Sequence, residues 1–291
     1  MRRVLLTGGS GFIGKNIISS HSNDFQWLAP SSAELNLCDE EALLSCIRQH
    51  QITDIVHSAV FNSLKNPNGK ECFSNLQMSM NIEKASHYVN KVIVLGSGAE
   101  YGKELPIQNV TEDQIGERIP KNEYGISKYM LNKIVRSSDN MYNLRLFGVF
   151  GPYENWEKCF ISNICCKAMY DLELTIRQNC IFSYVAVKDV VLGVENLLKK
   201  ERPNFRDYNL TYEQPITLLE IAQLVQRISG CGTSIQIAKE GMNLEYTGNG
   251  SRYRKEFLPE EHSYEREIEQ LYYWYVGRKE QINYSVIKNA R

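Results

Sequence analysis

The chain has 291 residues, and 43% of them are hydrophobic, which is enough to fill a sizeable core. Its 33 basic and 34 acidic side chains give a net charge of -1 without blocks of like charge, which argues against nucleic acid or a membrane surface as partner. No apolar run reaches the roughly 18 residues of a transmembrane helix, and glycines interrupt the apolar N-terminus too early for a signal peptide. We therefore expect a soluble, cytoplasmic protein with a small-molecule partner.

Short β-rich runs alternate with helical patterns in the first half of the chain. Strands are predicted at 3–7, 26–29, 54–59, 91–95 and 143–147, and helices at 39–50, 72–90 and 124–137. Strands alternating with helices of this length predict a parallel sheet covered on both faces. The expected fold class is α/β, a doubly wound parallel sheet of the Rossmann type with a smaller mixed α/β substrate-binding portion.

The second half is less regular. Helices are predicted at 160–168, 187–200, 217–229 and 264–275, and strands at 208–211 and 234–238; Thr217 and Glu220 have the spacing of a capping box. Since no flexible linker separates the halves, they should pack together around a cleft. We expect a dinucleotide-binding domain at 1–152, to which 183–213 returns, and a substrate-binding portion at 153–182 and 214–291.

A glycine turn follows the first predicted strand. Gly8, Gly11 and Gly14 have the spacing G-x-x-G-x-x-G, and a helical pattern begins at Lys15. Glycines allow a tight turn and a close approach of the backbone, and the helix N-terminus presents free N–H groups to a pyrophosphate. This segment is predicted to bind a dinucleotide.

The end of the second strand bears on the choice of dinucleotide. An acidic residue about 20 residues after the glycines normally binds the adenosine ribose 2′-hydroxyl of NAD. Here the strand ends in Trp27-Leu-Ala-Pro-Ser31-Ser32, and Ser31 and Ser32 could donate to a 2′-phosphate. We expect NADP(H) to be preferred, with NAD(H) as the alternative.

A tyrosine and a lysine stand four residues apart, at Tyr124 and Lys128, and so share one helix face. A nearby ammonium stabilises a phenolate and lowers the pKa of the phenol, as acid/base chemistry at a carbonyl requires. Upstream, the buried-strand pattern from Val92 ends at Ser97, where a hydroxyl at the carboxyl end of a parallel strand faces the ligand crevice. These three side chains are the candidate catalytic residues.

Together these segments resemble the extended short-chain dehydrogenase/reductases, the family of sugar-nucleotide epimerases, reductases and dehydratases. The resemblance implies that Tyr124 is the general acid/base, that Lys128 also holds the nicotinamide ribose, and that Ser97 hydrogen-bonds the substrate oxygen. It implies a nucleotide sugar as substrate, and a homodimer formed through helices 72–90 and 124–137. The segments that carry it are TGGSGFIG, ELNLCD, HSA before Val60, Asn75, GSGAEYG, YGISK, LRLFGVFGP and VKDVV. Besides Tyr124 and Lys128, the cofactor-binding residues expected are Gly8, Ser10, Gly11, Phe12, Ile13, Gly14, Ser31, Asn36, Leu37, Ala59 and Asn75.

The residues beside Ser97 separate the reactions of this family. Where the dehydratases carry an Asp-Glu pair, this chain has Gly98 and Ala99, and strand pleating should point Glu100 away. Alanine also replaces the cysteine that transfers protons at carbon in enzymes that make GDP-fucose. We expect reduction of the C4 ketone of a nucleotide-linked 4-keto-6-deoxysugar, for surface polysaccharide synthesis. The alternatives are a UDP-sugar 4-epimerase with retained NAD, and a regulator that senses dinucleotides without turnover.

Other residues remain open or are expected to be structural. Phe182 stands where relatives often carry an arginine that grips the diphosphate, which leaves Arg177, Lys158 and Arg254 as candidates. His57 is expected to be a hydrogen-bonded structural histidine, and the aromatic run 272–275 to pack in the core. The eight scattered cysteines are expected to be buried free thiols, with no metal site.

Overall fold

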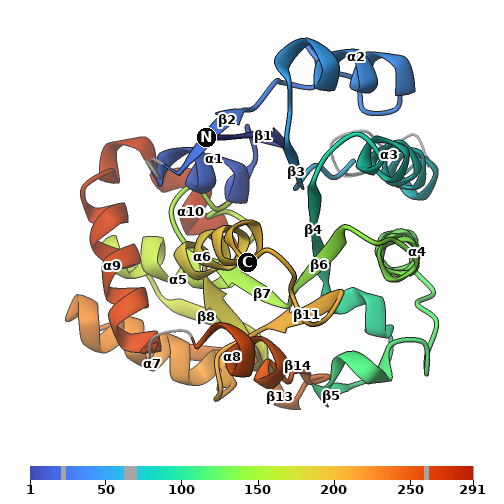
Figure 1. The fold of residues 1–291 in the computed structure, drawn as a ribbon. Helices are drawn as coiled ribbons and strands as arrows, with labels where there is room; N and C mark the ends of the chain where they lie inside the picture. The colour runs from blue at the N-terminus through green and yellow to red at the C-terminus, as the bar shows by residue number, and fades with distance from the viewer. Residues whose placement is uncertain (21–23, 62–70, 259–261, 291) are drawn as a thin grey trace.

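A computed structural model describes residues 1–20, 24–61, 71–258 and 262–290 of the chain. A six-stranded sheet in the order β11-β6-β4-β3-β1-β2 runs through the molecule (Figure 1), and each neighbouring pair of its strands is parallel. The strands are β1 (Arg2–Thr7), β2 (Phe25–Leu28), β3 (Asp54–His57), β4 (Lys91–Ser97), β6 (Met141–Leu146) and β11 (Asp207–Leu210). The predicted doubly wound sheet is confirmed.

Helices cover both faces of this sheet (Figure 1). They are α1 (Phe12–Ser19) and α6 (Val187–Lys199) on one face, and α2 (Glu40–His50), α3 (Glu71–Ser86) and α4 (Glu123–Ser137) on the other. A hydrophobic core lies on each face of the sheet, and alternate residues of β4 point into one or the other. Ile93 packs in the core under α1 and α6, and Val92 and Val94 pack in the core under α3 and α4. Successive side chains of a strand point to opposite faces, so a strand buried on both is apolar throughout.

A third core lies beside the sheet, among α5 (Phe160–Met169), α7 (Leu218–Ser229), α9 (Tyr264–Val276) and α10 (Tyr284–Asn289). Thr217 caps α7 and forms the predicted capping box with Glu220. Tyr272 and Tyr275 are buried in this core, although Tyr273 is exposed. The aromatic run is therefore mainly a packing element, as expected.

Several short strands join the segments around the carboxyl end of β4. A four-stranded sheet has the order β12-β9-β14-β5, with β5 (Ile107–Val110), β9 (Ile181–Phe182), β12 (Ile216–Thr217) and β14 (Tyr246–Gly248). Two-stranded sheets pair β7 (Gly148–Phe150) with β10 (Tyr184–Ala186), and β8 (Leu174–Asn179) with β13 (Ile235–Met242). The remaining elements are α8 (Ser251–Phe257) and the 3-10 helices η1 (Gly98–Tyr101), η2 (Glu112–Gln114) and η3 (Lys279–Gln281).

Some sequence predictions need correction. Helix α3 ends at Ser86 rather than at Asn90, and β13 continues to Met242. The eight cysteines are free, but Cys38 is exposed, and only Cys165, Cys166, Cys180 and Cys231 are fully buried. None of the described helices combines the length and hydropathy that crossing a membrane requires.

Candidate active site

The fold brings Ser97, Tyr124 and Lys128 together at the carboxyl end of β4. Ser97 is the last residue of that strand and is 8% exposed. Tyr124 lies in the first turn of α4, which begins where the Asn122 side chain accepts a hydrogen bond from the Gly125 N–H at 2.8 Å. Tyr124 lies close enough to Ser97 for the serine hydroxyl to act on the pKa of its phenol. Sequence positions 97 and 124, far apart along the chain, thus form one site.

Lys128 is buried behind Tyr124, one helical turn along α4. Its Nζ donates to the Leu95 carbonyl at 2.8 Å and lies 5.9 Å from the centre of the Tyr124 ring. Burial lowers the pKa of Lys128 to about 8, while the Glu100 carboxylate acts in the opposite direction. The ammonium is therefore much closer to losing its proton at neutral pH than an exposed lysine.

The expected lowering of the Tyr124 pKa is wrong for this structure. Burial raises the pKa of the phenol, the nearby Ser97 hydroxyl lowers it, and the charges of Glu100 and Glu71 raise it further. Desolvation disfavours the phenolate, and the neighbouring carboxylates add to that effect. Tyr124 is consequently a neutral phenol with a proton to donate.

Glu100 differs from the sequence prediction in its local structure. The chain after Ser97 forms η1 instead of continuing as a strand, so pleating does not set the direction of Glu100. Its buried carboxylate turns back to accept the Ser97 N–H at 2.8 Å, closing a capping box. It also accepts from Asn143 Nδ2 and from Arg145 Nε, at 2.8 Å for the latter. Glu100 thus fixes the backbone that presents Ser97.

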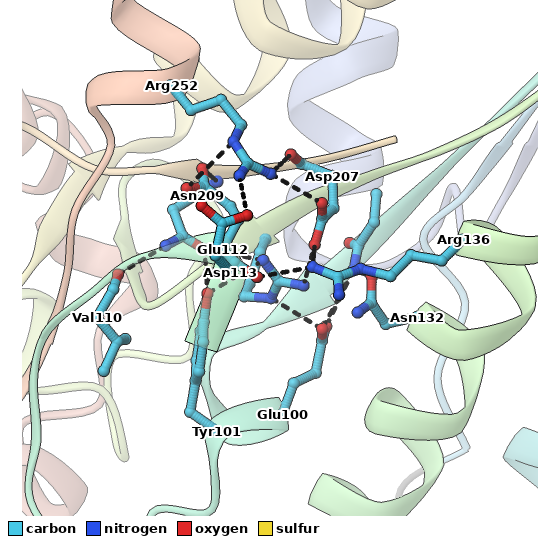
Figure 2. A network of polar contacts seen from close by, with 12 residues as sticks. Glu100, Tyr101, Val110, Glu112, Asp113, Asn132, Arg136, Asp207, Asn209 and Arg252 are labelled. Atoms are coloured by element: carbon cyan, nitrogen blue, oxygen red, sulfur yellow. Dashed lines mark hydrogen bonds and ion pairs between the residues drawn. The ribbon is translucent and has the colours of Figure 1, made fainter. Parts of the chain in front are cut away.

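A buried ionic network continues from Glu100 (Figure 2). Arg145, fully buried on β6, reaches Glu100 through Nε and Asp207 on β11 through Nη2, at 2.8 and 3.0 Å. Asp207 also pairs with Arg136 at 2.8 Å and with Arg252 at 3.2 Å. Charges removed from water are tolerated when each has opposite charges and hydrogen bonds, and this network ties β11, β6 and η1 together.

The glycine turn fits a dinucleotide pyrophosphate. A Cβ on Gly14 would lie 2.3 Å from the Gly8 carbonyl oxygen, and one on Gly8, whose φ is +73°, would lie 2.8 Å from the backbone of Ala59. Helix α1 begins after Gly11 without a side-chain cap, so its first N–H groups are free for an anion. The crowding explains why only glycine serves at these positions.

The turn after β2 contains a carboxylate, Glu34, that the sequence interpretation overlooked. Ser31 and Glu34 form a turn in which the Glu34 carboxylate accepts the Ser31 N–H at 2.7 Å. This contact lowers the pKa of Glu34. Ser31 therefore lies beside a negative charge, which weakens the argument for a 2′-phosphate at this point.

The other predicted cofactor residues lie around the same edge of the sheet. Leu37 is buried in the core with α2 and α3, whereas Asn36 is exposed. Asn75 is 8% exposed, and its amide bonds both the N–H and the carbonyl of Phe61, at 2.9 and 3.1 Å. Asn75 thus holds the chain just after Ala59 instead of presenting a free amide. Of the remaining predicted residues, Ser10 is exposed, and Phe12 and Ile13 are half-buried in the first turn of α1.

His57 is structural, as expected. It is 2% exposed at the end of β3, and its Nδ1 is 2.9 Å from Thr7 Oγ1. Burial lowers its pKa to about 3, and the charge of Lys128 lowers it further. A histidine held neutral in this way packs and hydrogen-bonds, and it takes up no proton near pH 7.

A second tyrosine near Ser97, Tyr246, was not predicted from the sequence. The Tyr246 hydroxyl, on β14, lies 2.7 Å from where a Cβ on Gly98 would be, and its ring packs against Phe147 and Phe182 with centroids 5.3 and 5.4 Å apart. A lone tyrosine in the polar stretch around position 246 carries no periodic signal. Only the long-range pairing of β14 with β5 and β9 brings it here.

The three cations suggested from the sequence for binding the substrate diphosphate lie apart from one another. Phe182 packs on Tyr184 and Tyr246, so it is part of an aromatic cluster. Arg177 and Lys158 are exposed, and Arg254 donates to the Thr211 carbonyl at 3.2 Å. The structure thus does not gather these three cations at one point.

A doubly wound sheet with a glycine turn after its first strand, and with a serine, a tyrosine and a lysine at the end of β4, defines an extended short-chain dehydrogenase/reductase. The chain belongs to the NAD dependent epimerase/dehydratase family, whose model matches residues 4–211.

Comparison with known proteins narrows the class. The chain is 28% identical over 173 residues to the GDP-L-colitose synthase of Yersinia pseudotuberculosis, covering 54% of this chain and 56% of that protein. It spans about half the length of the curated relatives it matches. The fold resembles an NADP-bound GDP-L-fucose synthetase from Naegleria fowleri, with a TM-score of 0.80, 17% identity, and 96% and 95% of the two chains covered. It also resembles a UDP-glucose 4-epimerase from Thermotoga maritima, with a TM-score of 0.79, 21% identity, and 96% and 100% covered.

Proposed function

We propose that this protein reduces the C4 ketone of a nucleotide-linked 4-keto-6-deoxysugar with NAD(P)H, in the synthesis of surface polysaccharide precursors. The observation that carries the proposal is the meeting of Ser97, Tyr124 and Lys128 beside a turn that fits a dinucleotide. The similarity to a GDP-L-colitose synthase supports a nucleotide sugar as substrate.

Tyr124 is the proton donor in this proposal. Reduction turns a carbonyl oxygen into an alkoxide that must gain a proton, and Tyr124 is a neutral phenol because burial raises its pKa. The Ser97 hydroxyl donates to the same oxygen and stabilises the charge that develops there. Lys128 stabilises the phenolate left after transfer and holds the nicotinamide ribose.

A bound nicotinamide dinucleotide supplies the hydride in this scheme. Gly8, Gly11 and Gly14 would hold its pyrophosphate, with Ser10, Phe12 and Ile13 in the same turn; Ser31, Asn36, Leu37, Ala59 and Asn75 lie along its expected path. We propose NADP(H) as the preferred form on the precedent of the NADP-bound synthetase. The Glu34 carboxylate, bonded to the Ser31 N–H, would repel a 2′-phosphate and so reduces the expected preference for NADP(H) over NAD(H).

The arrangement around Ser97 argues against dehydration. Abstraction of a ring proton needs a free carboxylate, but the Glu100 carboxylate is occupied by the Ser97 N–H, by Asn143 and by Arg145. Gly98 and Ala99 offer no acid or base. The residues at the site therefore support proton transfer at oxygen only.

The test is a panel of GDP-, dTDP-, CDP- and UDP-linked 4-keto-6-deoxysugars, each assayed with NADPH and with NADH. The proposal expects stoichiometric loss of absorbance at the reduced nicotinamide band with at least one of them. Tyr124→Phe should lower turnover by several orders of magnitude while leaving NADPH affinity nearly unchanged, because it removes the proton donor alone. Interconversion of UDP-sugars without net redox change would favour the 4-epimerase, and binding without turnover would favour the dinucleotide-sensing regulator.

The domain division and the dimer also remain proposals. We propose a dinucleotide-binding unit at 1–152, joined by 183–213, and a substrate-binding portion formed by 153–182 and 214–291. For the dimer, α3 and α4 pack side by side, and Phe73, Met80 and Met130 are exposed apolar residues on them. Gel filtration with light scattering tests whether two copies meet on these helices, and Met80→Glu should give a monomer.

A further inference from the structure

Three aromatic side chains form a layer beside the catalytic serine. The rings of Phe147, Tyr246 and Phe182 follow one another with centroids 5.3 and 5.4 Å apart, and Phe182 stacks on Tyr184 at 5.1 Å. Tyr184 is buried, whereas Phe147, Tyr246 and Phe182 are half-buried. These three half-buried residues, called the aromatic wall below, therefore retain surface that a ligand can cover.

Glycines bring the aromatic wall up to Ser97. A Cβ on Gly98, the residue after Ser97, would lie 2.5 Å from a ring carbon of Phe147 and 2.7 Å from the Tyr246 hydroxyl oxygen. A Cβ on Gly248 would collide with the same Phe147 ring. Rings that fill the places of absent side chains cannot shift without a loss of packing. The wall thus begins directly at the catalytic serine and is fixed there.

Two polar side chains that neighbour the wall in sequence are already bonded within the protein. Ser183 is 2% exposed, and its Oγ accepts the Gly248 N–H at 3.2 Å. Thr247 is also 2% exposed, and its Oγ1 accepts the Asn109 N–H at 2.7 Å. The Tyr246 hydroxyl lies at the end of the wall next to the serine. Apart from that hydroxyl, the side chains of the wall present only ring carbons.

The proposed reduction determines which part of the substrate meets these rings. Ser97 binds the oxygen on C4, and only C5 separates C4 from C6, so C6 lies close to the residues that flank Ser97. We propose that the aromatic wall receives the C6 methyl group of a 6-deoxysugar and selects against sugars with a hydroxyl at C6. A methyl group gains from apolar burial, whereas a hydroxyl there would lose water without gaining a hydrogen bond. This inference rests on the proposed function and assigns its substrate specificity to Phe147, Tyr246 and Phe182.

The test compares two substrates that differ only at C6. The reaction is run in reverse with NADP+ and either GDP-L-fucose or GDP-L-galactose, which carries a hydroxyl on C6. We expect kcat/KM to be roughly 100-fold higher for the 6-deoxysugar, as an apolar pocket discriminates against an added hydroxyl. If another member of the nucleotide panel turns over fastest, its product and the 6-hydroxy analogue of that product replace this pair. A wild-type ratio below about threefold would overturn the proposal.

Two variants at one position assign the selection to the wall. Phe182→Gln and Phe182→Leu both remove a half-buried ring, but only glutamine brings hydrogen-bonding groups. The 6-deoxy to 6-hydroxy ratio of kcat/KM should fall at least about fivefold in Phe182→Gln and stay within about twofold of wild type in Phe182→Leu. An equal change in both variants would mean that the ring only supports the fold, and would overturn the proposal.

The outcomes also separate this inference from the proposed function. An active Tyr124→Phe, or a panel in which no 4-keto sugar consumes NADPH, refutes the proposed function itself. Equal turnover of the 6-deoxy and 6-hydroxy sugars by an enzyme that needs Tyr124 removes the C6 selection alone. The wild-type comparison needs no variant, so it gives a result even if a Phe182 variant does not fold.

Discussion

Replacing Arg145 by methionine tests how the site is supported. Arg145 is fully buried, and it gives Asp207 and Glu100 an ionic partner at 3.0 and 2.8 Å. Asp207 keeps Arg136 and Arg252 after the change. Glu100, 0% exposed, keeps only the neutral donors of Ser97 and Asn143. The variant therefore leaves one buried carboxylate without an ion-pair partner, with only the buried Lys128 ammonium to act on it.

The loss of unfolding free energy in Arg145→Met follows from these contacts. Removing one partner of a buried ion pair costs about 3–5 kcal/mol of unfolding free energy. At roughly 2–4 °C per kcal/mol for a chain of this size, the melting temperature should fall by roughly 6–20 °C. Differential scanning calorimetry measures this change of melting temperature directly. The activity should fall as well, because Glu100 holds the backbone of Ser97.

Two further variants make this result decisive. Arg136→Met removes a partly exposed arginine from the still-paired Asp207 and should cost no more than about 1 kcal/mol. Glu100→Leu combined with Arg145→Met should be less destabilised than Arg145→Met alone, since the Glu100 carboxylate that lost its ion-pair partner is then absent. If Arg145→Met shifts the melting temperature no more than Arg136→Met does, the network does not support the fold in the way described.

Three other predictions concern the charge of Lys128, the preference between NADPH and NADH, and the glycine turn. Because the pKa of Lys128 is lowered to about 8, kcat/KM should fall as pH rises through 8 and the ammonium is lost, and a flat profile to pH 9.5 contradicts its role. Glu34→Gln removes the negative charge at Ser31 and should lower the KM for NADPH relative to that for NADH in steady-state assays; an unchanged ratio shows that this carboxylate is remote from the 2′ position. Gly14→Ala places a Cβ 2.3 Å from the Gly8 carbonyl and should weaken NADPH binding by roughly tenfold or more in calorimetry, whereas Gly232→Ala, with nothing within 4 Å, should not.

The fold was predictable from the sequence where local pattern and packing agree. The apolar run 92–95 is buried on both faces of the sheet, and four consecutive apolar residues predict this without knowledge of any long-range contact. Thr217 and Glu220 mark the start of α7 because a capping box is a contact within one turn. Tyr124 and Lys128 are likewise neighbours on one helix, so their spacing alone places them together.

The features that could not be predicted from the sequence depend on contacts between residues far apart in the chain. Strands β5, β9 and β14 have two to four residues each and exist because they pair with segments 34 to 139 positions away, which no local pattern encodes. Tyr246 therefore could not be foreseen as a neighbour of Ser97. Glu34 was missed because a turn, rather than the strand, brings its carboxylate back to Ser31. The pKa of Tyr124 depends on burial and on Glu100, which the lysine spacing does not report.

The most direct test of the central claim follows a labelled hydrogen. The enzyme is incubated with a nucleotide-linked 4-keto-6-deoxysugar and NADPH dideuterated at C4 of the nicotinamide, and the product is analysed by mass spectrometry and NMR. The account predicts one deuterium at C4 of the sugar for each NADPH oxidised, and no deuterium elsewhere on the ring. A product without deuterium, or a rearranged sugar formed while NADPH is conserved, would contradict it.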